Sequence, residues 1–234
     1  MVASKVRIGL DLTPFRTSRD FGLVFAGIGI SSLGSYITAI SIPFQVAVLT
    51  RSPVMVGLLG LCELVPLLLM AFVGGALADY LDRRRLVIFG EVAAALLTGA
   101  LLVNAIVGEP RLWVLFAVAA AATAVDGLQR PALDALTPRL VPAAQIPAAG
   151  SLNSLRSTIA SLGGPAITGV LLASVGIRWV YLIDLATFVA SLTCLAFIKA
   201  VPAAARVIAS PCRWIRLDQR EVTVASSAPA AGAA

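Results

Sequence analysis

The sequence has no histidine, only three cysteines and few charged residues. Without histidine, zinc and haem sites lose their commonest ligand. The cysteines lack the close spacing of a metal site or disulfide framework, so we expect neither. Charged residues make up 13% of the 234 residues and hydrophobic residues 59%, whereas a soluble globular chain is about a quarter charged. The composition therefore predicts that most of the chain lies in lipid.

The apolar residues form six runs, and a spanning helix needs roughly 20 such residues. The runs cover residues 21–50, 53–79, 84–107, 112–130, 147–175 and 178–199. We predict an all-α, polytopic membrane bundle of six transmembrane helices over residues 21–200. Residues 1–20 would form a cytoplasmic lead-in, since they carry scattered charges and no signal-peptide core. Residues 201–234, rich in Ala, Pro and Ser, are predicted to be a disordered cytoplasmic tail.

Arginine and lysine alternate with the predicted spans, and cytoplasmic loops carry an excess of these residues. Clusters lie before the first span, at residues 83–85, at Arg130 and Arg139, and after the sixth span, while the other loops hold only Arg51, Arg111 and Arg178. This bias predicts that both termini are cytoplasmic, in a bacterial-type inner membrane. The net charge of +6 is therefore a topological signal, and we expect no nucleic-acid partner.

The loop after the second span places an anion and several cations at unfavourable helix ends. Asp79 ends one helix, and Arg83 and Arg84 begin the next. A pair between Asp79 and an arginine would offset both costs, so we interpret this loop as a charge latch. An ordinary positive-inside loop is the alternative. Asp82 fits the N-cap of the third span, and Gly75 permits close approach of a neighbouring helix.

Charged residues inside spans are costly and usually face the bundle or a water-filled cavity. Glu63 shares a helix face with Gly60 and Pro66, and a carboxyl in that position can take up and release a proton. The alternative is a neutral carboxyl that links two helices by a hydrogen bond.

In the first span, the spacing of Gly27, Ser31 and Ser35 predicts a small-residue packing face.

Three further polar residues are candidates for substrate binding or proton coupling, each with an alternative. Asp126 is one, and the alternative, which we prefer, is an interfacial i,i+4 pair with Arg130. Arg156, one turn from Asn153, could bind an anionic substrate or balance Glu63 or Asp126, or it could extend to the cytoplasmic surface. Asp184 lies close to Arg178 in sequence, and we interpret it as structural.

The Asp79 loop resembles motif A of the major facilitator superfamily. Gly75, Asp79, Arg83 and Arg84 match the motif, whereas Tyr80 and Asp82 depart from it. The fifth span is similar to motif C of the superfamily's proton antiporters, a helix-packing motif matched by Gly164, Pro165 and Gly169. Thr168 stands in place of one motif C glycine. Segments before the first span and between the fourth and fifth spans resemble the enterobactin-exporter group.

This resemblance implies export of a small molecule, such as a drug-like compound or a siderophore, by alternating access. Proton entry would supply the energy, and no cofactor or enzymatic activity is implied. It also implies two three-helix repeats that together make the N-terminal half of a twelve-helix fold. The second half would come from a homodimer or a separate chain. The alternatives are a truncated, non-transporting remnant or a modulator of another transporter, and a membrane enzyme or receptor.

Overall fold

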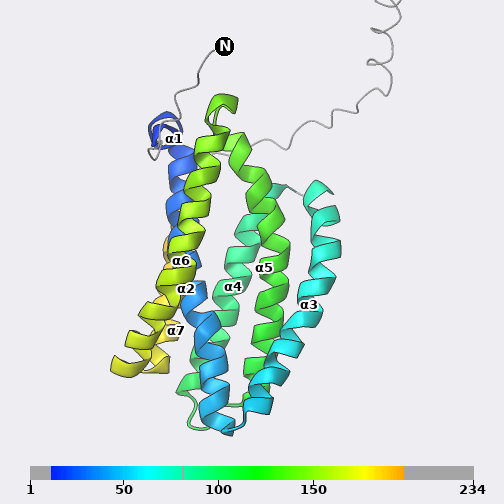
Figure 1. Cartoon of the computed structure of the whole chain (residues 1–234), viewed down its shortest axis with the longest axis vertical. Coiled ribbons are helices and arrows are strands. Elements are labelled where there is room, and N and C mark those ends of the chain that lie inside the picture. The colour runs from blue at the N-terminus through cyan, green and yellow to red at the C-terminus, as the bar shows by residue number, and fades with distance from the viewer. Residues whose placement is uncertain (1–11, 81, 198–234) are drawn as a thin grey trace, which may run out of the picture. The chain divides into compact units, whose positions relative to one another are not determined.

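The computed structural model describes residues 12–80 and 82–197, and for residues 71–80, Thr137 and Arg139 it describes the backbone only. The described part contains helices and no strand (Figure 1). The elements are α1 (Thr13–Thr17), α2 (Arg19–Thr50), α3 (Pro53–Tyr80), α4 (Arg83–Ile106), α5 (Leu112–Leu140), the 3-10 turn η1 (Ala143–Gln145), α6 (Ile146–Ser174) and α7 (Ile177–Ala196). The predicted all-α class is confirmed. The predicted tail, residues 201–234, lies outside the described residues.

Six of these helices, α2 to α7, are long and apolar enough to cross a membrane. They correspond one to one with the six predicted spans, because long apolar runs are a strong signal in sequence. Local chemistry fixes several ends. Ser18 caps α2 by accepting from the Phe21 backbone N–H at 3.2 Å, and Asp82 caps α4 by accepting from the Arg84 N–H at 3.0 Å. Arg51 ends α2 in a left-handed conformation with φ 51°.

The helices pack in the order α3, α5, α4, α7, α2, α6, each against the next. Exchanging α2, α3 and α4 with α5, α6 and α7 gives the same order read backwards, so the same pairs of helices are in contact, as expected for two three-helix repeats. The two helices at the ends of the order, α3 and α6, are the least covered. Only 6% of the most apolar 18-residue stretch of α3 is buried, and 17% of the corresponding stretch of α6. Each of these helices therefore leaves a broad apolar face open.

The interior has two apolar clusters separated by a polar layer. One cluster gathers around Phe21, Val87 and Leu136, and the other around Val46, Leu101 and Tyr181. Buried polar side chains lie between them in sequence on the four most central helices: Ser31, Thr38, Glu91, Thr98, Gln129, Asp184 and Ser191. Because buried polar groups in a membrane helix are costly and usually functional, this layer is the candidate position of a functional site.

Candidate functional site

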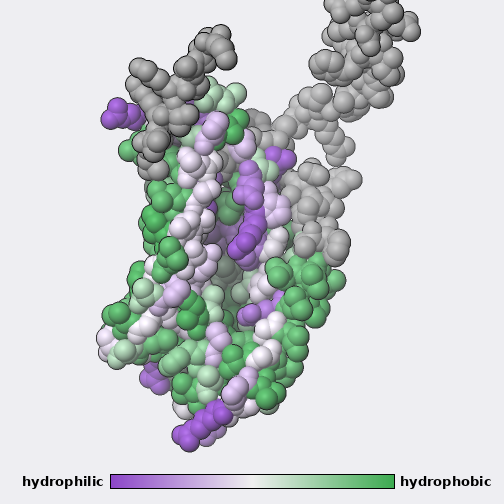
Figure 2. Space-filling view, in the orientation of Figure 1, coloured by the Kyte–Doolittle hydropathy of each residue, from purple (hydrophilic) through white to green (hydrophobic). Residues whose placement is uncertain are grey.

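A cavity of about 630 Å³ lies against the polar layer. Residues of α2, α4, α5, α6 and α7 line it, together with Glu63 of α3. Figure 2 shows hydrophilic side chains along a hollow between α6 and α5, with apolar side chains on both sides. Its charged lining residues are Glu63, Glu91, Asp126, Arg130, Asp134, Arg156 and Asp184. All four transport candidates named from the sequence, including Asn153, line this one cavity.

Glu91 lies at the centre of one buried hydrogen-bond network and is only 3% exposed. Its Oε1 accepts from Ser31 Oγ of α2 at 3.2 Å and from Gln129 Nε2 of α5 at 3.0 Å. Gly90 makes room for the amide, since a Cβ there would come within 2.7 Å of Gln129 Cδ. The network therefore joins three helices through one carboxylate oxygen.

Asp184 of α7 forms a second network and is 1% exposed. Its Oδ2 accepts from Thr38 Oγ1 of α2 at 2.5 Å and from Thr98 Oγ1 of α4 at 3.0 Å. Arg178 is engaged elsewhere, since its Nε donates to the Ala105 carbonyl at 3.0 Å. Asp184 thus lies in the polar layer among hydroxyl donors. It does not pair with Arg178, its neighbour in sequence.

Arg156 reaches the cavity from α6. Its side chain passes over Gly29 of α2, where a Cβ would lie 3.5 Å from Arg156 Cδ. It interacts electrostatically with Asp134 of α5 and Glu91 of α4. The sequence had instead suggested Glu63 or Asp126 as its partner. The Nε atom is buried and has no hydrogen-bond partner among the described residues.

The other two acidic candidates have different surroundings. Asp126 and Arg130 form the i,i+4 ion pair considered above, with Arg130 Nε 3.0 Å from Asp126 Oδ2 and both side chains more than half exposed. Glu63 is half-buried at the edge of the cavity and forms no hydrogen bond or ion pair that links it to another described helix. A role as hydrogen-bond link between helices therefore gains no support from these contacts.

The motif A region is only partly described, because the structure describes Gly75 and Asp79 by their backbone only. Arg83 Nη1 donates to the Ala135 carbonyl of α5 at 3.0 Å, and Arg84 Nη2 donates to the Leu195 carbonyl of α7 at 3.4 Å. Cations near the C-terminal end of a helix are favourable. The two arginines therefore tie the start of α4 to the ends of α5 and α7.

The motif C residues lie on two faces of α6. Gly164 is buried against α2, where a Cβ would come within 2.7 Å of Tyr36 Cβ. Thr168 donates to the Gly164 carbonyl at 2.7 Å, which satisfies its hydroxyl within the helix. Pro165 and Gly169 are exposed, and a Cβ at Gly169 would meet nothing within 4 Å.

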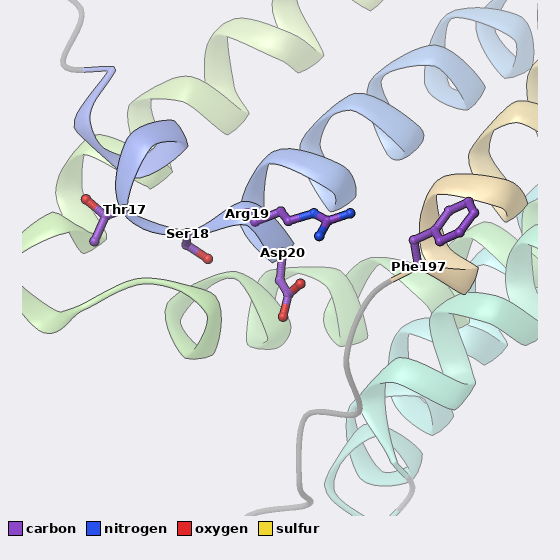
Figure 3. A pocket seen from close by; sticks show the side chains of 5 residues that line it. All are labelled: Thr17, Ser18, Arg19, Asp20 and Phe197. Atoms are coloured by element: carbon purple, nitrogen blue, oxygen red, sulfur yellow. The ribbon is translucent and has the colours of Figure 1, made fainter.

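A second hollow of about 300 Å³ lies at the start of α2. Figure 3 shows Thr17, Ser18, Arg19 and Asp20 from that end and Phe197 from the end of α7 around it. Its Ser18 hydroxyl is used as the α2 cap. We therefore interpret this hollow as a result of how the helix ends pack, and not as a binding site.

The sequence reasoning missed Glu91, Gln129 and the placement of Asp184. A signal was present in the helical spacing, because Glu91 and Thr98 are seven residues apart, as are Asp184 and Ser191. Residues at this spacing lie on one helix face. Two polar stripes on adjacent spans could have been recognised as facing each other.

Comparison with known proteins places these features in a family. The family model of the transmembrane secretion effectors of the major facilitator superfamily matches residues 10–211. The enterobactin exporter EntS of Salmonella paratyphi A is 29% identical over 172 residues, which are 74% of this chain and 42% of that protein. The exporters of Citrobacter koseri and Escherichia coli O127:H6 give the same identity over 41% of their length.

The chain spans about two fifths of the length of these curated relatives. The six apolar helices make it a multi-pass membrane protein. The family match covers most of the chain, including every described helix from α1 to α7. The chain therefore belongs to the transmembrane secretion effector family of the major facilitator superfamily.

Proposed function

We propose that this chain is the N-terminal six-helix half of a proton-coupled exporter that moves a small molecule by alternating access. The observation that carries the proposal is the cavity lined by buried and half-buried charges between two apolar layers. Polar groups of this kind are rare in membrane helices and mark substrate and ion pathways. Family membership supports export as the direction of transport.

The lining suggests which residues contact the cargo. Arg156 and Asn153, one turn apart on α6, would bind an anionic or polar group, while Glu63 and Asp126 would bind a proton or a cationic group. The cavity also carries apolar residues such as Ile28, Leu97 and Phe188, which suit a partly apolar molecule. The EntS relatives are named as enterobactin exporters, and for this chain a siderophore or a drug-like compound would fit this description.

A second six-helix unit would complete the transport path. The open apolar faces of α3 and α6 flank the cavity-lining helices in the packing order, so a second unit would cover both faces. A homodimer or a separate chain would supply it. We place both termini in the cytoplasm on the arginine bias, which puts the start of α2 inside and the start of α5 outside.

Motif A would then act at the cytoplasmic side. Asp79, Gly75, Arg83 and Arg84 would form the latch between two conformations, with the arginines alternating between Asp79 and the helix ends that they contact here. Gly164 would hold α6 close to α2 during the change, while Pro165 and Gly169 would face the second unit. The proton motive force would drive the cycle without a cofactor.

The proposal predicts proton-driven uptake into everted membrane vesicles that contain the protein. Respiration acidifies the vesicle interior, and an exporter exchanging protons for cargo would concentrate its cargo inside. Ethidium serves as the drug-like probe and enterobactin as the siderophore probe, with vesicles lacking the protein as the control. Uptake of either probe above the control, abolished by an uncoupler, is the expected result. Uptake of both probes equal to the control, or insensitive to the uncoupler, would contradict the proposal.

A further inference from the structure

Two buried oxygen atoms lie side by side in the polar layer. Ser31 and Gln129 both donate to Glu91 Oε1, while Glu91 Oε2 has no hydrogen bond from either of them. Ser191 of α7 lies beside this carboxyl, close enough for its hydroxyl to hydrogen-bond it. Both Glu91 Oε2 and Ser191 Oγ are buried. Because buried oxygens in proteins are nearly always hydrogen-bonded, these two atoms are expected to pair with each other.

The two atoms can pair in either protonation state of Glu91. The Ser191 hydroxyl donates to the charged carboxylate, and it accepts from a protonated Oε2. The two bonds to Oε1 remain in both states, because a neutral carboxyl still accepts there. The same partners therefore hold the charged and the neutral side chain, as a group that gains and loses a proton requires.

The charged form has one counter-charge that it shares. Arg156 interacts with both Glu91 and Asp134, so a proton on Glu91 would leave Arg156 with Asp134 as its carboxylate partner. Asp184 of α7 also interacts electrostatically with Glu91 and is held by hydroxyl groups, and Asp126 and Arg130 of α5 line the same cavity. From α2, only the neutral Ser31 reaches the Glu91 carboxylate.

We propose that Glu91 also binds and releases a coupling proton, in addition to the groups at the cavity surface, with Ser31, Gln129 and Ser191 as positioning residues and Arg156 as the counter-charge. Hydronium on the outer side supplies the proton, and an O–H bond forms at Oε2. The same bond breaks on the inner side, where water takes the proton. The role in transport rests on the proposed function, whereas protonation of Glu91 can be measured without transport.

Infrared spectroscopy of the protein in nanodiscs tests protonation directly. The chain has four glutamates, Glu63, Glu91, Glu109 and Glu221, so labelling with ¹³C-glutamate separates their carboxyl bands from those of aspartate. We expect a label-sensitive band of a protonated carboxyl away from bulk water, which grows as the pH is lowered. Glu63→Gln should retain this band and Glu91→Gln should lose it.

Several results would overturn the assignment. They are a wild-type protein without this band, a band that does not change with pH, and a band that persists in Glu91→Gln. Glu91→Gln keeps an acceptor for Ser31 and Gln129, which favours folding. If it fails to fold, labelled Glu63→Gln still decides, because Glu91 is then the remaining glutamate in the described spans.

A transport measurement separates this assignment from the proposed function. In proteoliposomes, Glu91→Gln should lose proton-driven uptake of the transported probe but retain probe exchange at equal pH, since exchange requires no net proton movement. Proton-driven uptake that persists in Glu91→Gln would overturn the assignment. If the wild-type protein transports neither ethidium nor enterobactin, the proposed function fails, and the infrared result alone decides whether Glu91 binds a proton.

Discussion

Replacing Gly34 with valine is expected to lower the stability of the helix bundle by more than a valine at an open glycine position. Gly34 faces α7, where a Cβ would collide with Thr187 Oγ1 and Asp184 Oδ1 and would lie 3.3 Å from Asp184 Cα. The added side chain must separate the two helices or displace Asp184. Forcing extra atoms into a packed interface costs about 1–3 kcal/mol.

The loss should exceed this steric cost because Asp184 holds two further helices. Its carboxylate accepts from Thr38 and Thr98, and interhelical hydrogen bonds in membranes average about 0.6 kcal/mol each. Reversible unfolding in detergent micelles measures the change. Gly99→Val on α4 is the matched control, since a Cβ at Gly99 meets nothing within 4 Å. Equal losses in the two variants would show that α2 and α7 do not pack as described.

Arg156→Gln is expected to reduce energised transport at least about tenfold, equivalent to ~1.4 kcal/mol in the transport barrier. The reason is that Glu91 and Asp134 both interact with this guanidinium. Without it, Glu91 loses the cation with which it interacts, and an anionic cargo loses its binding group. Arg156→Lys should restore part of the activity, because an ammonium keeps the charge but not the planar geometry.

Arg130→Gln is the control for this prediction. Arg130 also lines the cavity, but its pair with Asp126 is mostly exposed, and exposed pairs contribute only about 0–1 kcal/mol. Uptake into everted vesicles, compared at equal protein levels, measures both variants. A similar loss in Arg130→Gln and Arg156→Gln would mean that general positive charge in the cavity, rather than the position of Arg156, supports transport.

Much of the fold could be predicted because membrane spans and caps are local features. Six apolar runs predicted six helices, and the N-cap role of Asp82 followed from a short polar side chain before a helical run. The packing face of α2 was predicted in part. Gly27 and Ser31 are buried as expected, but the third small residue that contacts α7 is Gly34, while Ser35 is exposed and lines the cavity.

The polar networks could not be predicted from such local features, because they join residues far apart in sequence. Ser31 and Glu91 are 60 positions apart, and Thr38 and Asp184 are 146 apart. Which polar residues meet depends on the rotation of each helix about its axis, which side-chain packing sets. Glu63 stood out in sequence because it interrupts a long apolar run, yet the deeper carboxylates are Glu91 and Asp184.

The cavity along α2, α5 and α6 is expected to be a water-filled path in the membrane. Cysteine accessibility in native membranes measures this, after Cys62, Cys194 and Cys212 are replaced by serine. Single cysteines at Ser35 and Ser154, which line the cavity, are compared with one at Leu162, which is 72% exposed but does not line it. A charged, membrane-impermeant thiol reagent should label the first two positions and not Leu162→Cys. If Ser35→Cys and Ser154→Cys react no faster than Leu162→Cys, the cavity is closed to water and is not a transport path.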